Sequence, residues 1–294
     1  MKIILGTAQL GLQYGIVNKS KQPTEEESIN IIKMCIANNI TTFDTARCYG
    51  TAEELLGLFN NITTITKLDG VPNYHNLSEF EITKLIYESV QTSLYNLKKI
   101  DIFLLHNINH YSCNQHYIWN MLKHYKKRKF FNKIGVSVYT VDEAIELLLD
   151  KTVDVIQIPL NILDMRWYNA RFQSLIKYRK DVQIYCRSIF LQGIISSDII
   201  PTIKDVDVSL YISKLNTLVV DFNLSSRTEL AIAYIKSIDW ISGVIFGIDN
   251  IEQLQINIDL CTGVNQLTDK QMNIIKLTFA DVPDKLLNPT LWQL

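Results

Sequence analysis

Four polar residues of different types lie at or just after the ends of short β-branched runs, and together they suit the reduction of a carbonyl. They are Asp44, Tyr49, Lys67 and His106. A tyrosine can protonate the oxygen of a carbonyl whose carbon receives hydride, if a nearby ammonium lowers the pKa of the tyrosine. A carboxylate paired with the ammonium keeps it charged and in place, and a histidine can orient the same oxygen. We therefore predict Tyr49 as a general acid assisted by Lys67, Asp44 and His106.

Elements that could bring these residues together follow from the hydrophobic pattern. The expected strands are residues 3–5, 41–43, 62–65, 102–105, 134–138, 153–158, 182–185 and 243–246. The expected helices are residues 25–38, 52–59, 79–97, 116–128, 141–149, 171–179, 228–237 and 251–260. Thr24, Ser78 and Thr140 precede three of them as helix N-caps. The longest irregular stretch, at about 191–208, is expected to form a substrate or cofactor loop.

Eight alternating strand–helix units predict an α/β fold, a closed (β/α)8 TIM barrel in a single domain over residues 1–294. Residues 267–294 are expected to add a C-terminal helix and tail. The four polar residues would then meet at the carboxyl ends of the strands, where barrel enzymes keep their sites. A doubly wound sheet is the alternative, but Gly6, Gly11 and Gly15 are too widely spaced for a GxGxxG fingerprint.

Composition limits the classes of partner. The 29 basic and 30 acidic residues nearly cancel and are spread along the chain, which disfavours nucleic acid and anionic membranes. The run Lys126-Lys127-Arg128-Lys129 is interpreted as a helix end rather than a binding patch. The apolar run after Lys2 is too short for a signal peptide, so we expect a cytoplasmic protein. Its expected partner is a small-molecule carbonyl compound, and the sequence predicts no oligomeric state.

Cysteine and histidine positions do not indicate a metal site. The five cysteines are odd in number and none has CxxC spacing, so reduced thiols are expected. His106, His110, Cys113 and His116 include zinc-ligand types, but the expected loop 107–115 holds no pair at zinc-finger spacing.

Specific motifs surround the four polar residues. They are LGTAQLG at 5–11, FDTARCYG at 43–50 followed by EELLG at 53–57, ITKL at 65–68 and LLHN at 104–107. In these segments, which fall in order along the chain, the sequence resembles the aldo-keto reductase family. The resemblance implies an NAD(P)-dependent oxidoreductase with a barrel fold, in which Asp44, Tyr49, Lys67 and His106 are the catalytic residues.

The resemblance also implies where NADPH or NADH would bind. The cofactor residues that it implies are Gly6, Thr7, Ala8, Asp44, Ser137, Gln157, Arg187, Ser188, Gly247, Ile248, Asp249, Gln253 and Asn257. Two departures stand out, because Val138 replaces a common asparagine and Arg187 takes the place of an aromatic residue. Members that prefer NADPH usually carry a cation near Gly247 and Gln253. We therefore expect dual or NADH-leaning use here.

Two other functions remain open. The chain could be a cofactor-binding but catalytically silent regulatory subunit, or Lys67 could form a Schiff base in an aldolase. The substrate is expected to be sugar-like, because residues 11–16 and 187–193 resemble a bacterial branch of the family linked to sugar metabolism. Its pocket could be lined by aromatic residues, of which the candidates are Tyr14, Trp167, Tyr168 and Trp292.

Overall fold

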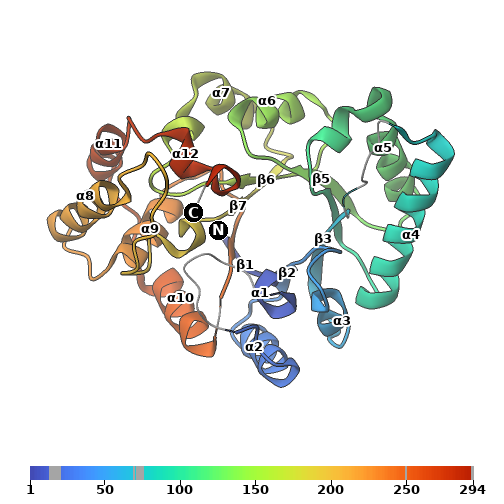
Figure 1. The fold of residues 1–294 in the computed structure, drawn as a ribbon, viewed down its shortest axis with the longest axis horizontal. Coiled ribbons are helices and arrows are strands. Elements are labelled where there is room, and N and C mark those ends of the chain that lie inside the picture. Colours follow the sequence, from blue (N-terminus) through green and yellow to red (C-terminus); the bar gives the residue numbers. More distant parts are fainter. Residues whose placement is uncertain (13–20, 69, 71–75, 249, 293–294) are drawn as a thin grey trace.

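A closed barrel of eight parallel strands forms the centre of the molecule (Figure 1). The computed structural model describes residues 1–12, 21–68, 70, 76–248 and 250–292. The strands are β1 (Lys2–Gly6), β2 (Thr42–Asp44), β3 (Thr63–Leu68), β4 (Ile102–Leu105), β5 (Lys133–Ser137), β6 (Val155–Pro159), β7 (Gln183–Arg187) and β8 (Gly243–Phe246). Each pairs with the next in sequence, and β8 pairs with β1. The predicted (β/α)8 barrel is confirmed.

A ring of helices surrounds the barrel (Figure 1). The longer ones are α2 (Glu25–Ala37), α4 (Glu79–Leu97), α5 (Asn109–Lys127), α6 (Val141–Leu149), α7 (Ala170–Tyr178), α8 (Val208–Asp221), α9 (Arg227–Lys236), α10 (Ile251–Gly263) and α11 (Asp269–Thr278). Short helices are α1 (Ala8–Gly11), α3 (Ala52–Leu56) and α12 (Asp284–Leu287), with 3₁₀ turns at Met165–Tyr168, Leu191–Gly193 and Pro289–Leu291. The predicted tail thus contains α11, α12 and the last of these turns.

Local signals account for several helix boundaries. The predicted N-caps Thr24, Ser78 and Thr140 each form a reciprocal capping box with a glutamate three residues later. The basic run ends α5 as expected, and Lys126 pairs with Asp154 at 2.6 Å.

Two helix predictions were wrong. Helix α5 begins at Asn109 rather than 116, because buried Tyr111 and Cys113 anchor a first turn that lacks a side-chain cap. The expected loop 107–115 is therefore mostly helix. Helix α8 was missed altogether; Asp207 caps it and its apolar side chains pack on the core.

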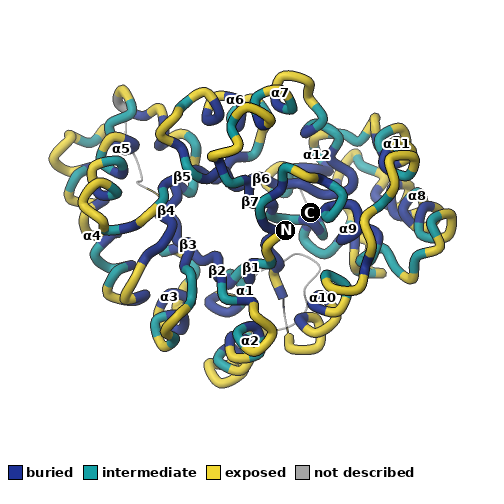
Figure 2. The backbone as a smooth tube through the Cα atoms, turned by 180° about the vertical axis from the view of Figure 1, so that it is seen from behind, coloured by how far each residue is buried: buried dark blue, intermediate teal, exposed yellow. Residues whose placement is uncertain are grey.

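Buried side chains form two layers around the strands. The large core lies between the strands and the helices, where Figure 2 shows the inward-facing backbone as buried. A separate cluster comprises Ile4, Ile65, Ile102, Leu104, Val155, Tyr185 and Ile245, all from barrel strands. Alternation along a strand sends one set of side chains to the helices and the other into the barrel. The barrel interior is therefore filled with apolar side chains.

In the residues that the structure describes, no helix is both long and apolar enough to cross a membrane. In the same part of the chain, no three His, Cys, Asp or Glu side chains gather as a candidate metal site. None of the five cysteines, all of them among the described residues, forms a disulfide.

Candidate active site

Asp44 and Lys67 form a buried ion pair at one end of the barrel. Lys67 Nζ lies 2.6 Å from Asp44 Oδ1 and donates a second bond of 2.8 Å to the carbonyl of Thr45. Asp44 is the last residue of β2, and Lys67 lies near the end of β3, its neighbour in the sheet. Burial lowers the pKa of Lys67, whereas the Asp44 carboxylate raises it and so opposes that loss of charge.

Asp44 has a second partner across the barrel. The amide of Gln157 donates a 2.7 Å bond to Asp44 Oδ2, and Ser137 Oγ donates to Gln157 Oε1 at 3.4 Å. Ser137, the last residue of β5, and Gln157, in the middle of β6, are register partners. The chain Ser137–Gln157–Asp44–Lys67 therefore crosses the barrel mouth and fixes both carboxylate oxygens.

Tyr49 lies directly above the ion pair. Lys67 Nζ is 5.2 Å from the centroid of its ring, and His106, just after β4, meets the ring edge-on at 5.9 Å. The structure thus brings Asp44, Tyr49, Lys67 and His106 together, and these four residues are called the tetrad below.

Two glycines hold the loop that carries Tyr49 against α1. A Cβ at Gly11 would lie 1.8 Å from the carbonyl oxygen of Tyr49. A Cβ at Gly50, which has a φ of +52°, would lie 2.3 Å from the carbonyl of Gly11. Side chains at either position would push the loop away, so glycine is required for this close approach.

Gly11→Ala is expected to lower the free energy of unfolding by about 1–3 kcal/mol, because the added methyl overpacks a backbone contact. Gly263→Ala is the control, since nothing lies within 4 Å of a Cβ built there. Urea unfolding of both variants checks this, and equal stability of the two would show that the loop yields freely.

His106 is held in its neutral form. Burial, followed by the charges of Lys67 and Arg187, lowers its pKa to about 3. Its Nδ1 lies 3.6 Å from Cys48 Sγ. A neutral imidazole can hydrogen-bond a carbonyl oxygen without competing for the role of acid.

This histidine should make the protein sensitive to acid. Its pKa lies near 6.5 when unfolded and about 3 when folded, so below pH 6.5 the unfolded chain binds a proton that the native protein does not. The contribution of neutral His106 to the free energy of unfolding is complete above pH 6.5 and is lost as the pH falls toward 3. From pH 7.5 to 5, the wild type should lose more unfolding free energy than His106→Gln. Parallel stability curves for the two proteins would contradict this.

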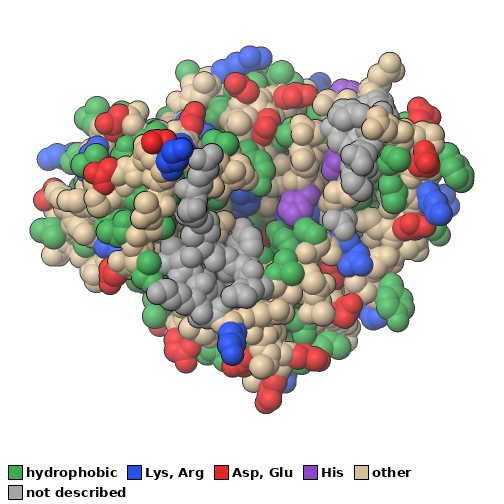
Figure 3. Space-filling model, viewed as in Figure 1, with side chains coloured by type: hydrophobic (Ala, Val, Ile, Leu, Met, Phe, Trp, Pro, Cys, Tyr) green, Lys and Arg blue, Asp and Glu red, His purple; other side chains and the backbone are tan. Residues whose placement is uncertain are grey.

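A cavity of about 840 Å³ opens above the tetrad and extends to α10. In Figure 3 a histidine and atoms of Lys or Arg side chains are visible in a central hollow. The predicted site residues that line the cavity are Gly6, Thr7, Ala8, Asp44, Tyr49, His106, Ser137, Gln157, Arg187, Ser188, Gly247, Gln253 and Asn257. Lys67 lies beneath it, buried by its partners. The side chain of Ile248 is buried in the core and does not line the cavity, and Asp249 lies outside the described residues.

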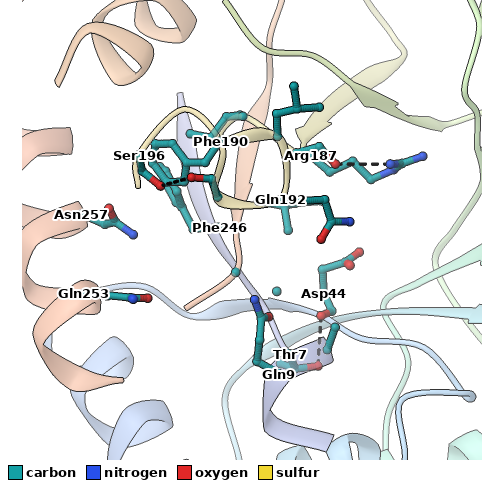
Figure 4. Close-up of a pocket in the computed structure, with 18 of the residues that line it drawn as sticks. Thr7, Gln9, Asp44, Arg187, Phe190, Gln192, Ser196, Phe246, Gln253 and Asn257 are labelled. Atoms are coloured by element: carbon teal, nitrogen blue, oxygen red, sulfur yellow. Dashed lines mark hydrogen bonds between the residues drawn. The ribbon is translucent and has the colours of Figure 1, made fainter. Parts of the chain in front are cut away.

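The cavity has two chemically distinct ends (Figure 4). Asp44 and Arg187 lie on one side, and Gln253 and Asn257 project from α10 on the other. Asn250 caps α10 by accepting a bond from the amide of Gln253. A helix N-terminus at this end suits an anionic group.

The loop after β7 covers the cavity between these ends. Ser188, Leu191 and Gln192 have positive φ angles of 60°, 46° and 56°, followed by Gly193 at 92°. Left-handed conformations cost non-glycine residues about 1–2 kcal/mol each. Such strain often accompanies functional sites, which agrees with the predicted role of this loop.

Several lining residues were not predicted from the sequence. Gln9, Tyr139, Phe190 and Gln192 also face the cavity. Gln9, Phe190 and Gln192 lie in segments singled out by their motifs, whereas Tyr139 does not. Conversely, Trp167 is buried, with its indole bonded to Asp164, and none of Trp167, Tyr168 and Trp292 lines this cavity. Tyr14 lies outside the described residues.

Comparisons with known proteins agree with the barrel fold. The model of the Aldo/keto reductase family matches residues 2–278. A search of curated proteins gives no match.

Solved structures share the fold at low identity. The aldo-keto reductase AKR11C1 from Bacillus halodurans, in its holo form, has a TM-score of 0.76 and 20% identity over 98% of this chain and 95% of its own. PA4992 from Pseudomonas aeruginosa, assigned as an aldo-keto reductase, has a TM-score of 0.62 and 18% identity over 88% of each chain. Since the family model spans nearly the whole sequence, the chain belongs to the aldo/keto reductase family of carbonyl oxidoreductases.

Proposed function

We propose that the protein reduces an aldehyde or ketone to an alcohol with NADPH or NADH, using Tyr49 as the general acid. The observation that carries this proposal is the buried Lys67–Asp44 pair beneath the Tyr49 ring at the cavity floor. It gives the tyrosine a fixed positive neighbour, which a proton donor needs as it becomes a phenolate.

Residues of the chain would act in sequence on the carbonyl oxygen. When bound, the reduced nicotinamide supplies the hydride to the carbonyl carbon. Neutral His106 would orient the oxygen, and Tyr49 would give it a proton as negative charge develops there. Lys67 would stabilise the resulting phenolate, while Asp44 holds the ammonium in place.

The cavity fits an extended nicotinamide cofactor. Ser137 and Gln157 present a hydroxyl and an amide beside the tetrad, which can hold a carboxamide. At Gly247 a Cβ would lie 2.6 Å from Gln9 Nε2, so a side chain there would fill the space between β8 and α1. The start of α10 offers backbone amides to a phosphate. A length of cavity with an amide site at one end and an anion site at the other matches a dinucleotide.

Cofactor choice depends on charge near α10. Among the described residues that line the cavity, the one Lys or Arg is Arg187, which lies at the tetrad end. A missing cation for the 2′-phosphate removes a charge-assisted bond of about 1.5–3 kcal/mol. We expect dissociation constants for NADH and NADPH within about tenfold of each other, measured by fluorescence titration. A hundredfold preference for NADPH would contradict this.

An aldolase is the weaker alternative. A Schiff-base lysine must reach its substrate as a free amine. Lys67 is 1% exposed, is bonded to two oxygens and does not line the cavity. Borohydride trapping with an aldehyde should therefore leave Lys67 unmodified.

Loss of nicotinamide absorbance with a panel of aldehydes, ketones and aldoses tests the proposed reaction. Oxidation of the cofactor that depends on the carbonyl compound is expected, and the aldoses test the sugar-like class. Tight cofactor binding without turnover of any compound would favour the regulatory-subunit alternative.

A further inference from the structure

We propose that Arg187 makes the site bind the reduced nicotinamide more tightly than the oxidised form, an inference that rests on the proposed cofactor. The oxidised ring carries a positive charge and the reduced ring is neutral. A fixed cation near the ring therefore repels one form and not the other.

Neutral groups hold the Arg187 guanidinium in the cavity wall. Its Nη2 donates a 3.1 Å bond to the carbonyl of Val138, and its Cζ lies 4.6 Å over the ring of Tyr139. Nη1 lies 3.5 Å from Ser188 Oγ, the contact drawn in Figure 4. No carboxylate of the described residues lies within ion-pair distance of this guanidinium. Its charge is therefore not neutralised locally.

The guanidinium acts on the tetrad end of the cavity. Its charge contributes to the lowered pKa of both His106 and Lys67, so its field reaches the reacting groups. The other cation there, Lys67, is already paired with Asp44. Arg187 thus supplies the net positive charge at the tetrad end of the cavity. The nicotinamide ring must lie at this end to deliver hydride beside Tyr49.

The two forms of the cofactor isolate this effect. Their phosphates and adenosine parts are identical, so any bond between Arg187 and a phosphate cancels in the ratio of the two dissociation constants. Only the interaction with the ring remains. A tenfold tighter binding of the reduced form corresponds to a shift of about 30 mV in the potential of the bound couple. The oxidised cofactor would also leave more readily, whereas hydride transfer from the bound reduced form would become less favourable by the same factor.

Dissociation constants for NADH and NAD⁺ should be measured by calorimetry for the wild type, Arg187→Gln and Arg187→Lys. We expect the wild type to bind NADH at least tenfold more tightly than NAD⁺. Arg187→Gln should lower this ratio about tenfold, mainly by tightening the binding of NAD⁺, while Arg187→Lys keeps most of it. Lys84→Gln, on an exposed part of α4, is the charge control and should leave the ratio unchanged.

The outcomes separate this inference from the proposed function. If Arg187→Gln weakens both forms equally or leaves the ratio unchanged, the charge effect is wrong although the cofactor assignment stands. If the wild type binds neither form, with either NAD or NADP, both proposals are overturned.

Discussion

Tyr49→Phe should lower kcat for carbonyl reduction by about a thousandfold, because the phenyl ring fills the same space but has no proton to give. The ring contacts with His106 and Lys67 do not need the hydroxyl, so folding and cofactor affinity should change little. Steady-state kinetics with the best carbonyl compound of the panel, together with cofactor titration, measures both quantities.

Tyr95→Phe is the matched control, since Tyr95 is 77% exposed on α4, far from the cavity lining. It should retain wild-type kcat. If Tyr49→Phe retains more than a tenth of wild-type kcat, another group donates the proton and the assigned role of Tyr49 is wrong.

Removing one partner of the buried ion pair should cause the largest loss of stability. Lys67→Met leaves the Asp44 carboxylate without its cation, and Asp44→Asn leaves the ammonium without its anion. Either change is expected to cost about 3–5 kcal/mol of unfolding free energy, because a buried charge is left uncompensated. The double variant should cost less than the sum of the two, since no charge then remains unpaired. Urea unfolding of the four proteins completes the cycle.

Lys84→Met provides the comparison on the surface. Lys84 and Glu88 are 3.9 Å apart and their side chains are more than half exposed, so its loss should change stability by less than about 0.5 kcal/mol. If Lys67→Met and Lys84→Met were equally stable, the buried pair would contribute nothing to folding.

The barrel was predictable because its strands and helices carry strong local signals. Short apolar runs alternate with capped amphipathic stretches, and Thr24, Ser78 and Thr140 form the capping boxes that their spacing predicts. Strand β3 was predicted too short, because polar Thr66 and Lys67 interrupt the apolar pattern. Those residues are nevertheless buried, satisfied by Glu53 and Asp44, contacts between elements that a local pattern cannot contain.

The tetrad could be located from the sequence since strand ends in a barrel must meet on one face. The contacts around Arg187 could not be predicted from the sequence. The hydrogen bond from Arg187 to the carbonyl of Val138 and its stacking on Tyr139 join the end of β7 to the segment after β5. These residues are about fifty positions apart in the sequence. Helix α8 was missed for a related reason. It lies in the long segment between β7 and α9, and its apolar residues are explained only by their packing against the core.

Hydride transfer to a carbonyl carbon is the central claim, and isotope transfer tests it most directly. The protein would be incubated with a carbonyl compound that it turns over and with reduced nicotinamide cofactor carrying two deuterium atoms at C4. Mass spectrometry of the alcohol should find one deuterium, on the carbinol carbon. An alcohol without deuterium, or oxidation of the cofactor with no alcohol formed, would contradict it.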